Sequence, residues 1–321
     1  MQSAEGSNGP MLIKEESLWF LDATLVLQAE NRLFRVFPGI LGAKSPVFQD
    51  MLAFPQPENG EMFDGCPLVR VSDSAVDMTF FLKAIFHYDF FEAWPTRAEF
   101  PIVAGILRLS QKYQVDPLRK RALVHLSERC AMTLQKWEES DEWESEVNPI
   151  ILLNLAREVS ADWILPSVLA ACCWLEPDEL VYGLPPSPGL TARITLTPAD
   201  IVLCMRGAVK LHTTWTSKLY DFLWVPQETS GCVEAPECFV KRVETRRAVE
   251  QCRSEKILPL YLWNDDDWQS LWAGVCTPCF HFMQKLYVES REEYWQALPE
   301  IFGLPAWATL EAMRDAALGG N

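Results

Sequence analysis

Cysteine is the residue type in this chain whose spacing could carry out chemistry. Of its ten cysteines, Cys276 and Cys279 form a Cys-x-x-Cys pair, and Cys232 and Cys238 form a wider pair upstream. Structural zinc takes four tetrahedral ligands and is commonly held by two short-spaced pairs that folding brings together. The sequence therefore predicts a structural zinc site made by these four thiols.

Several alternatives compete with this prediction. Cys252 and His281 could replace one of the four ligands, and the Cys232–Cys238 spacer is longer than in most zinc ribbons. The thiols could instead be ordinary, partly buried side chains. A redox role for Cys276 and Cys279 is disfavoured because no thioredoxin-like strand, loop and helix surround them.

Sequence signals of catalysis are absent. The chain has four histidines, none of them in an H-E-x-x-H motif, and it has neither a G-x-S-x-G motif nor a P-loop. The acidic triplet Asp265–Asp267 lacks an accompanying base and predicts a solvated turn or helix start. We expect no enzyme, no catalytic residue and no bound organic cofactor. A metal-dependent enzyme, the remaining alternative, would need an open coordination position that four thiolates do not leave.

The elements that must position the cysteines are predicted to be helices. Asn148-Pro149 and Thr197-Pro198 are N-cap and first-turn pairs, which predict a helical region over residues 148–225. Residues 226–321 form a Cys- and Trp-rich region. We predict a compact core around its cysteines, with an aromatic binding surface as the alternative. The tryptophans concerned are Trp263, Trp268, Trp272 and Trp295.

The N-terminal part predicts two short strands, a tight reversal and then helix. Ala23, Leu25 and Leu27 alternate with more polar residues, and Glu30-Asn31 supplies the turn, where Asn tolerates left-handed backbone. A second strand follows. Ser45-Pro46 then predicts an N-cap and a first helical residue.

This part of the chain resembles the BTB/POZ domain over about residues 18 to 130. Its order of motifs is an acidic residue and strand, a hairpin, a short helix, an SPxF helix start, a third strand and further helices. The matching segments are Asp22-Ala-Thr-Leu-Val-Leu27, Phe34-Arg-Val36, Leu41, Ser45-Pro-Val-Phe48, Met51, Leu68-Val-Arg-Val-Ser-Asp73, Leu109-Ser-Gln-Lys-Tyr113 and Val115-Asp-Pro-Leu118. One departure is Phe37-Pro38, where the family has a His-Arg pair, so a charged pocket is not carried over.

The resemblance implies an α+β fold, with a small three-stranded sheet flanked by helices over residues 15–132 and a mainly α-helical region after it. It also implies a homodimerising adaptor that recruits clients, often to a cullin-RING ubiquitin ligase. Asp22, Leu41, Phe48 and Met51 are the interface residues that it suggests. The later helices and the segment from Trp295 to Trp307 resemble C-terminal extensions of fungal BTB proteins.

Composition sets the remaining expectations. A net charge of -16 over 321 residues repels phosphate backbones, so we expect no direct nucleic-acid contact. A transcriptional or chromatin co-regulator, assembled through the BTB-like part, is the alternative function. We expect no membrane span and, with cysteines but no signal peptide, a location in the cytoplasm or nucleus. Residues 1–14 are predicted to be a disordered tail. Residues 133–147, with their acidic run, are predicted to be an exposed linker or helix face or, alternatively, a docking segment for a basic partner.

Overall fold

The chain folds into a mixed α/β structure with two compact units. The computed structural model describes residues 11–54, 60–139, 147–185, 193–215, 219, 221–223, 231–252, 262–263 and 265–319. The N-terminal unit comprises Met1–Arg129, Glu158–Ser160 and Asp315–Asn321, and the C-terminal unit comprises Cys130–Arg157 and Ala161–Arg314. The predicted combination of a small sheet with many helices is confirmed at this coarse level.

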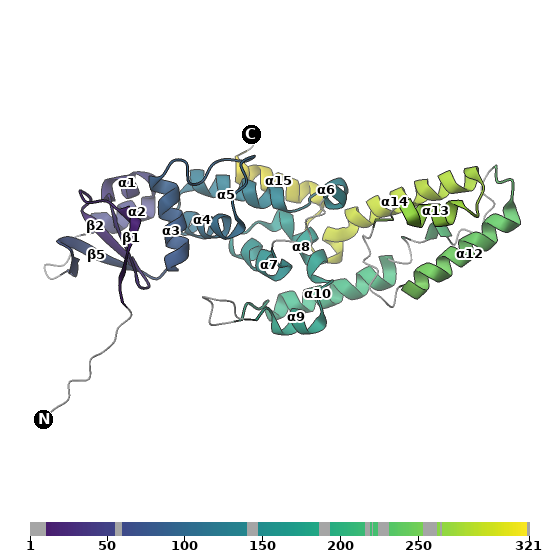
Figure 1. Cartoon of the computed structure of the whole chain (residues 1–321), viewed down its shortest axis with the longest axis horizontal. Coiled ribbons are helices and arrows are strands. Elements are labelled where there is room, and N and C mark those ends of the chain that lie inside the picture. Colours follow the sequence, from purple (N-terminus) through teal and green to yellow (C-terminus); the bar gives the residue numbers. More distant parts are fainter. Residues whose placement is uncertain are drawn as a thin grey trace, which may run out of the picture. The chain divides into compact units, whose positions relative to one another are not determined.

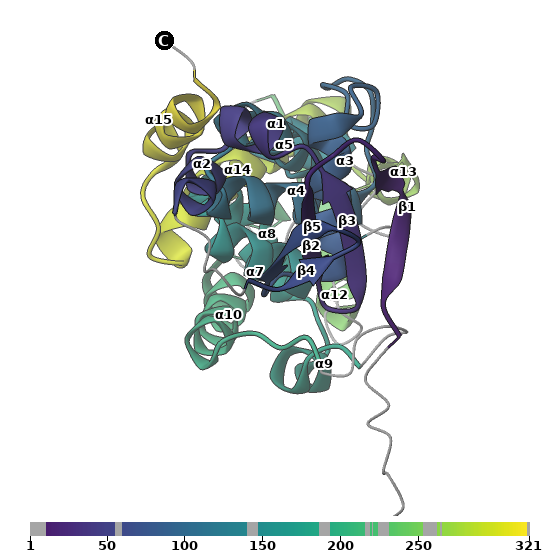
Figure 2. The same cartoon turned by 90° about the vertical axis from the view of Figure 1, so that its left-hand side faces the viewer.

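The N-terminal unit contains one small sheet (Figures 1 and 2). Its strands are β1 (Ile13–Trp19), β2 (Leu25–Ala29), β3 (Arg32–Val36), β4 (Met62–Phe63) and β5 (Cys66–Val71), in the order β1-β3-β2-β5-β4. β2 and β3 form an antiparallel hairpin in which Leu27 lies opposite Phe34, and β5 runs parallel to β2. Glu30, rather than Asn31, takes the left-handed backbone at the hairpin turn, with a φ of 51°.

The prediction of three strands is wrong, because two further strands join the sheet. β1 includes Ile13 and Lys14, which the sequence placed in a disordered tail. Its residues Lys14 to Ser17 are polar and hide the strand pattern, but Glu15 pairs with Arg32 of β3 at 3.1 Å. β4 and β5 form a second hairpin, whose turn has positive φ at Asp64 and Gly65. Residues 1–10 of the predicted tail lie outside the described part of the chain.

Five helices complete the N-terminal unit. They are α1 (Pro38–Lys44), α2 (Pro46–Ala53), α3 (Ala75–Phe86), α4 (Phe100–Lys112) and α5 (Asp116–Arg129). Leu27, Phe34 and Phe81 are among the fully buried side chains of its core. Phe48 of α2 stacks on Tyr113 at the end of α4, with ring centroids 4.3 Å apart. The apolar positions of strands and helices thus converge on one core.

Ser45 ties two of these helices together. Its side chain accepts a hydrogen bond from the backbone N–H of Phe48 at 3.1 Å, which confirms the predicted N-cap of α2. The same hydroxyl donates to the carbonyl oxygen of Tyr113, at the end of α4. Ser45 is fully buried, so both backbone groups depend on this hydroxyl rather than on water.

We expect Ser45→Ala to lower the free energy of unfolding by about 1–2 kcal/mol, because it removes an N-cap and leaves a buried carbonyl without its donor. Urea denaturation followed by circular dichroism measures this change. Ser17→Ala is the matched control, since the Ser17 hydroxyl is exposed and bonds only to Glu15. Equal stability of the two variants would contradict the role given to Ser45.

The described residues after α5 are mainly helical (Figure 1). The α-helices are α6 (Leu134–Glu139), α7 (Pro149–Glu158), α8 (Leu165–Cys172), α9 (Pro177–Tyr182), α10 (Pro198–Lys210), α12 (Ala235–Cys252), α13 (Asp265–Trp272), α14 (Thr277–Ile301) and α15 (Trp307–Leu318). Short turns lie at η2 (Asp162–Ile164), η3 (Leu211–Trp215) and η4 (Asp221–Leu223). Thr197 caps α10 as predicted, since its hydroxyl accepts from the N–H of Asp200. Asp265–Asp267 form the predicted helix start, at α13.

Part of the predicted acidic linker is helix α6. Its apolar residues Leu134 and Trp137 are three positions apart and both are buried. Glu138 forms an ion pair with Arg291 of α14, with Oε1 and Nη2 2.7 Å apart. Residues 134–139 therefore form a helix with one packed face, and residues 140–146 lie outside the described part of the chain. Among the helices that the structure describes, none has the length and apolar character to cross a membrane.

Candidate metal centre and interaction surface

The four predicted metal ligands lie at the beginnings of two helices. Cys232 precedes α12, and Cys238 lies in the first turns of that helix. Cys276 is the N-cap of α14, and Cys279 lies in its first turn. Thr277-Pro278 favours a helix start at this point, because Pro suits the first turn, where its missing N–H is not needed.

Folding brings the four sulfurs together, although Cys232 and Cys276 are more than forty residues apart in the sequence. All four Sγ atoms lie within 4.8 Å of one another, and those of Cys232 and Cys276 are 3.8 Å apart. A tetrahedral site with zinc–sulfur bonds of about 2.3 Å has sulfur–sulfur edges of about 3.8 Å. A disulfide would need about 2.05 Å, and all four cysteines are free thiols. The spacing fits a tetrahedral metal better than a disulfide.

The surroundings favour a thiolate at Cys276. Cys238, Cys276 and Cys279 are buried and Cys232 is partly exposed. The backbone N–H of Cys276 donates to the Cys238 sulfur at 3.2 Å, and two helix N-termini direct partial positive charge at the group. Burial raises the pKa of the Cys276 thiol, but hydrogen bonds from the backbone at Val233 and Cys279 and from neighbouring thiols lower it to about 6. For Cys238, burial is the dominant cause, and it raises the pKa of the thiol.

A close backbone approach and an aromatic cluster hold the site. A Cβ added to Gly274 would lie 2.6 Å from Cγ of Lys241, so a larger residue in the loop before Cys276 would have to displace this side chain of α12. Phe280, next to Cys279, packs on Trp272 with centroids 4.3 Å apart and on Trp268 at 5.7 Å. The same cluster continues through Trp263, which lies 4.9 Å from Trp268.

Trp295 does not belong to this cluster, and its predicted place beside the cysteines is wrong. Trp295 stacks on Trp307 at 5.3 Å and contacts Trp137 at 5.6 Å, in a second aromatic cluster. The reason is geometric, since Trp295 lies sixteen residues beyond Cys279 on the same helix, about 24 Å along its axis.

Of the alternative ligands, His281 is not part of the four-thiol group. His281 is exposed, and its ring contacts Trp272 and Phe280 at 6.4 and 6.0 Å. The side chain of Cys252 lies outside the described part of the chain. Cys172 and Cys173 lie at the end of α8, where the Cys173 thiol donates to the carbonyl oxygen of Cys204 at 3.3 Å. No local sequence pattern predicts this contact between α8 and α10.

Four thiolates would fill the tetrahedral coordination of zinc and leave no position for water or substrate. Such a site cross-links elements rather than activating a nucleophile. Within the described residues, these four cysteines are the one group of three or more ligating side chains close enough to share a metal ion. The arrangement therefore supports a structural metal centre that joins α12 to α14.

Comparison of the chain with protein-family models, with curated proteins and with solved structures finds no match in any of the three.

Two of the four predicted interface residues lie in the core, and the other two lie at the surface. Leu41 and Phe48 are 0% exposed, so their assignment to an interface is wrong, and their apolar character serves the core instead. Asp22 is exposed and Met51 is partly exposed. Two neighbouring apolar side chains are also accessible: Leu21 is 80% exposed and Ile40 is 41% exposed. Both lie just outside the buried strand and helix residues, where a partner could contact them.

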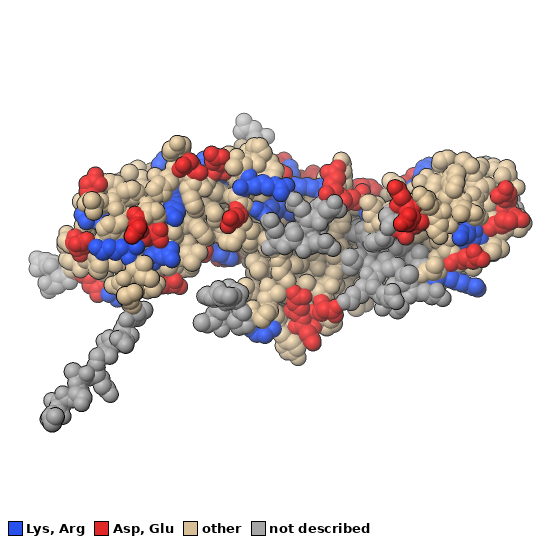
Figure 3. Space-filling model, viewed as in Figure 1, with Lys and Arg blue, Asp and Glu red and all other residues tan. Residues whose placement is uncertain are grey.

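Leu21 and Ile40 flank one aromatic contact. Phe20, which follows β1, packs on Phe37, which precedes α1, with centroids 5.4 Å apart. The contact brings the end of β1 close to the start of α1. We call Leu21, Asp22 and Ile40 the β1–α1 surface. On the face shown in Figure 3, Lys and Arg side chains are interspersed with Asp and Glu over the described part of the N-terminal unit.

Proposed function

We propose that this chain is a protein-interaction adaptor whose N-terminal unit is a BTB/POZ-like module that forms homodimers, and whose C-terminal unit is stabilised by structural zinc. The observation that carries the proposal is the exposure of Leu21 and Ile40 beside the edge strand of a small sheet. As the BTB resemblance implies, such modules recruit clients, often to cullin-RING ubiquitin ligases.

The order of elements supports the BTB-like assignment. A β2–β3 hairpin is followed by α1, by α2 beginning directly after Ser45, by strand β5 and then by α3, α4 and α5. This is the order that the sequence resemblance leads us to expect. The hairpin alone would be only marginally stable, and the helices supply the core it needs.

The β1–α1 surface suits association of two identical copies. β1 pairs with β3 and forms one edge of the sheet (Figure 2), and an exposed edge is a template for further strand pairing. Exposed Leu and Ile side chains next to that edge gain roughly 1.5–3 kcal/mol each on full burial. A twofold arrangement would use the same surface on both copies.

We expect the full chain to form a dimer at micromolar concentration, and Leu21→Asp or Ile40→Asp to convert it to a monomer of 36.6 kDa. Burying an unpaired carboxylate in the contact would cost more than the apolar side chain contributes. Multi-angle light scattering measures the mass, and circular dichroism checks that the variants fold. Val76→Asp is the control, because Val76 is also exposed but lies at the other end of α3 from Phe86, which contacts Phe20. A monomeric wild-type chain would sink the dimer proposal.

Recruitment of a ubiquitin ligase is tested separately. The full chain would be mixed with a purified cullin and its RING subunit and analysed by size-exclusion chromatography. Co-elution would support the adaptor proposal. A stable dimer that does not bind the cullin would instead restrict the proposed function to assembly.

A further inference from the structure

Helix α10 of the C-terminal unit is apolar on two faces. One stripe, which includes Cys204, Gly207 and Leu211, is buried against the rest of the unit. A second stripe, Val202, Met205 and Val209, is 44%, 54% and 62% exposed. Its spacing of three and then four residues places these side chains on one side of the helix. A helix with one packed face is normally polar on the other, so the second stripe suits a second partner.

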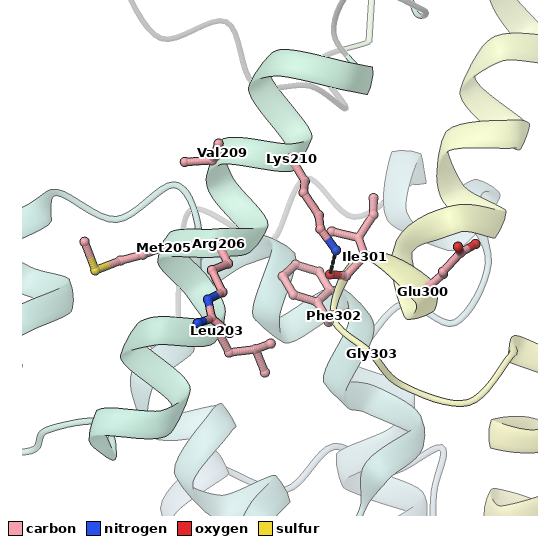
Figure 4. A pocket seen from close by; sticks show the side chains of 9 residues that line it. All are labelled: Leu203, Met205, Arg206, Val209, Lys210, Glu300, Ile301, Phe302 and Gly303. Carbon is pink, nitrogen blue, oxygen red and sulfur yellow. Dashed lines mark hydrogen bonds between the residues drawn. The ribbon is translucent and has the colours of Figure 1, made fainter.

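A pocket opens beside this stripe, between α10 and the end of α14 (Figure 4). Its volume is about 600 Å³. It is lined by Leu203, Met205, Arg206, Val209, Lys210, Glu300, Ile301, Phe302 and Gly303. A pocket of this size accommodates a large apolar side chain.

A glycine fixes one wall of the pocket. A Cβ added to Gly207 would lie 2.2 Å from the Phe302 ring, so the ring lies directly on the backbone of α10. Lys210 donates to the carbonyl oxygen of Ile301 at 3.3 Å and holds the same turn from the other side. The fold thus fixes the wall of the pocket that the buried residues Ile301 and Phe302 form.

The charge beside the stripe is positive. Arg206 is exposed and, within the described residues, takes part in no hydrogen bond or ion pair. The one acidic residue of α10, Asp200, is buried and pairs with Arg157 at 2.8 Å. Figure 4 shows the Glu300 carboxylate directed away from Arg206. In a chain with a net charge of -16, this is a local cationic site that an acidic partner complements.

We infer that the exposed face of α10 docks an amphipathic, acidic helix of a partner protein. The partner's apolar side chains, spaced three and four residues apart, pack on Val202, Met205 and Val209. One of them enters the pocket, and a neighbouring carboxylate pairs with Arg206. A second copy of this chain suits the face less well, because two α10 helices packed together would bring Arg206 and Lys210 of both copies close to one another. The inference goes beyond the proposed function and does not depend on dimerisation through the β1–α1 surface.

The test is a selection of peptides on the full chain. A displayed library of helical peptides about 16 residues long, with an apolar stripe and randomised flanking positions, is selected on the wild-type chain. We expect the enriched peptides to carry Asp or Glu beside the stripe. A synthetic copy of the best peptide should bind at least about tenfold more weakly to the double variant Met205→Asp/Val209→Asp.

Exchanging the charges of Arg206 and of the peptide acid that contacts it tests the proposed ion pair directly. Arg206→Glu should weaken the acidic peptide about tenfold, and a peptide with Lys in place of its contacting acid should recover binding to that variant. Val288→Asp is the control, because Val288 is exposed on α14 but does not line the pocket. Absence of enriched peptides, enrichment without acidic residues, or equal binding to Met205→Asp/Val209→Asp would overturn the inference. A change in the mass of the chain caused by that double variant would show that a second copy covers the face, and would overturn it too.

Discussion

Removal of zinc is expected to unfold the part of the C-terminal unit built from α12, α13 and the start of α14. The four cysteines join α12 to α14, and aromatic side chains of α13 pack beside them, where Trp272 contacts Phe280 of α14. Apparent binding free energies of structural zinc in small peptides are about 10–16 kcal/mol, far more than one side-chain contact contributes. We therefore expect this loss to exceed the effect of any other change considered for the chain.

Metal analysis of the purified chain should find one zinc ion per chain, and cobalt substitution should give the spectrum of a tetrahedral thiolate site. Cys238→Ser or Cys276→Ser should lose the metal. Each variant should melt at a lower temperature, with a change in the fluorescence of Trp263 and Trp268, which contact each other. Chelation of the wild-type chain under reducing conditions should give the same result.

Cys173→Ser is the matched control, because Cys173 is a partly exposed thiol whose hydrogen bond is to Cys204, away from the four ligands. It should keep the zinc. The metal proposal is falsified if the chain is free of zinc, yet melts at the same temperature with and without chelator. A disulfide found by mass spectrometry between Cys232 and Cys276 would favour the redox alternative.

The second large effect is expected at the ion pair between α6 and α14. Arg291 is 2% exposed, and its Nε and Nη2 atoms donate to Oε1 of Glu138 at 2.9 and 2.7 Å. Nη1 of Arg291 also lies 3.3 Å from the hydroxyl oxygen of Tyr287. Glu138→Gln would remove the negative charge that lies directly against a buried guanidinium. We expect a loss of about 3 kcal/mol from the free energy of unfolding.

Replacing the arginine should lower the free energy of unfolding less than replacing the glutamate does. Arg291→Met leaves Glu138 with a side chain 27% exposed, which water can reach, and it replaces a buried charge by an apolar side chain of similar length. Urea denaturation compares both variants with Glu139→Gln, a neighbour that is exposed and bonds only within α6. If Glu138→Gln is no more destabilising than Glu139→Gln, the pair does not hold α6 in place.

The features that could be predicted from the sequence are those that neighbouring residues encode. Ser45-Pro46 and Thr197-Pro198 encode helix starts through their own side chains, so both N-caps could be predicted. The pair Cys276 and Cys279 was visible for the same reason. Its approach to Cys232 and Cys238 could be expected only by analogy with known zinc sites, because no local pattern encodes it.

Contacts between residues far apart in the sequence could not be predicted. Glu138 and Arg291 are 153 residues apart, and an acidic run gives no indication that one of its members pairs with a buried arginine. Leu41 and Phe48 were assigned to a surface because apolar residues on short helices suit a core and an interface equally well. β1 was missed because it is an edge strand with mostly polar residues, and edge strands need little apolar surface.

The length of α14 has a mechanical consequence. Its 25 residues span about 37 Å, with the four thiols at one end and the wall of the α10 pocket at the other. Between them the helix is fastened a second time, through Arg291 and the stack of Trp295 on Trp307. After loss of the metal, α14 should unfold first at its cysteine end, while its C-terminal end stays folded. Hydrogen exchange after metal loss should therefore accelerate around Cys279 and leave the turn at Leu298 protected, so that α10 still presents its outer face.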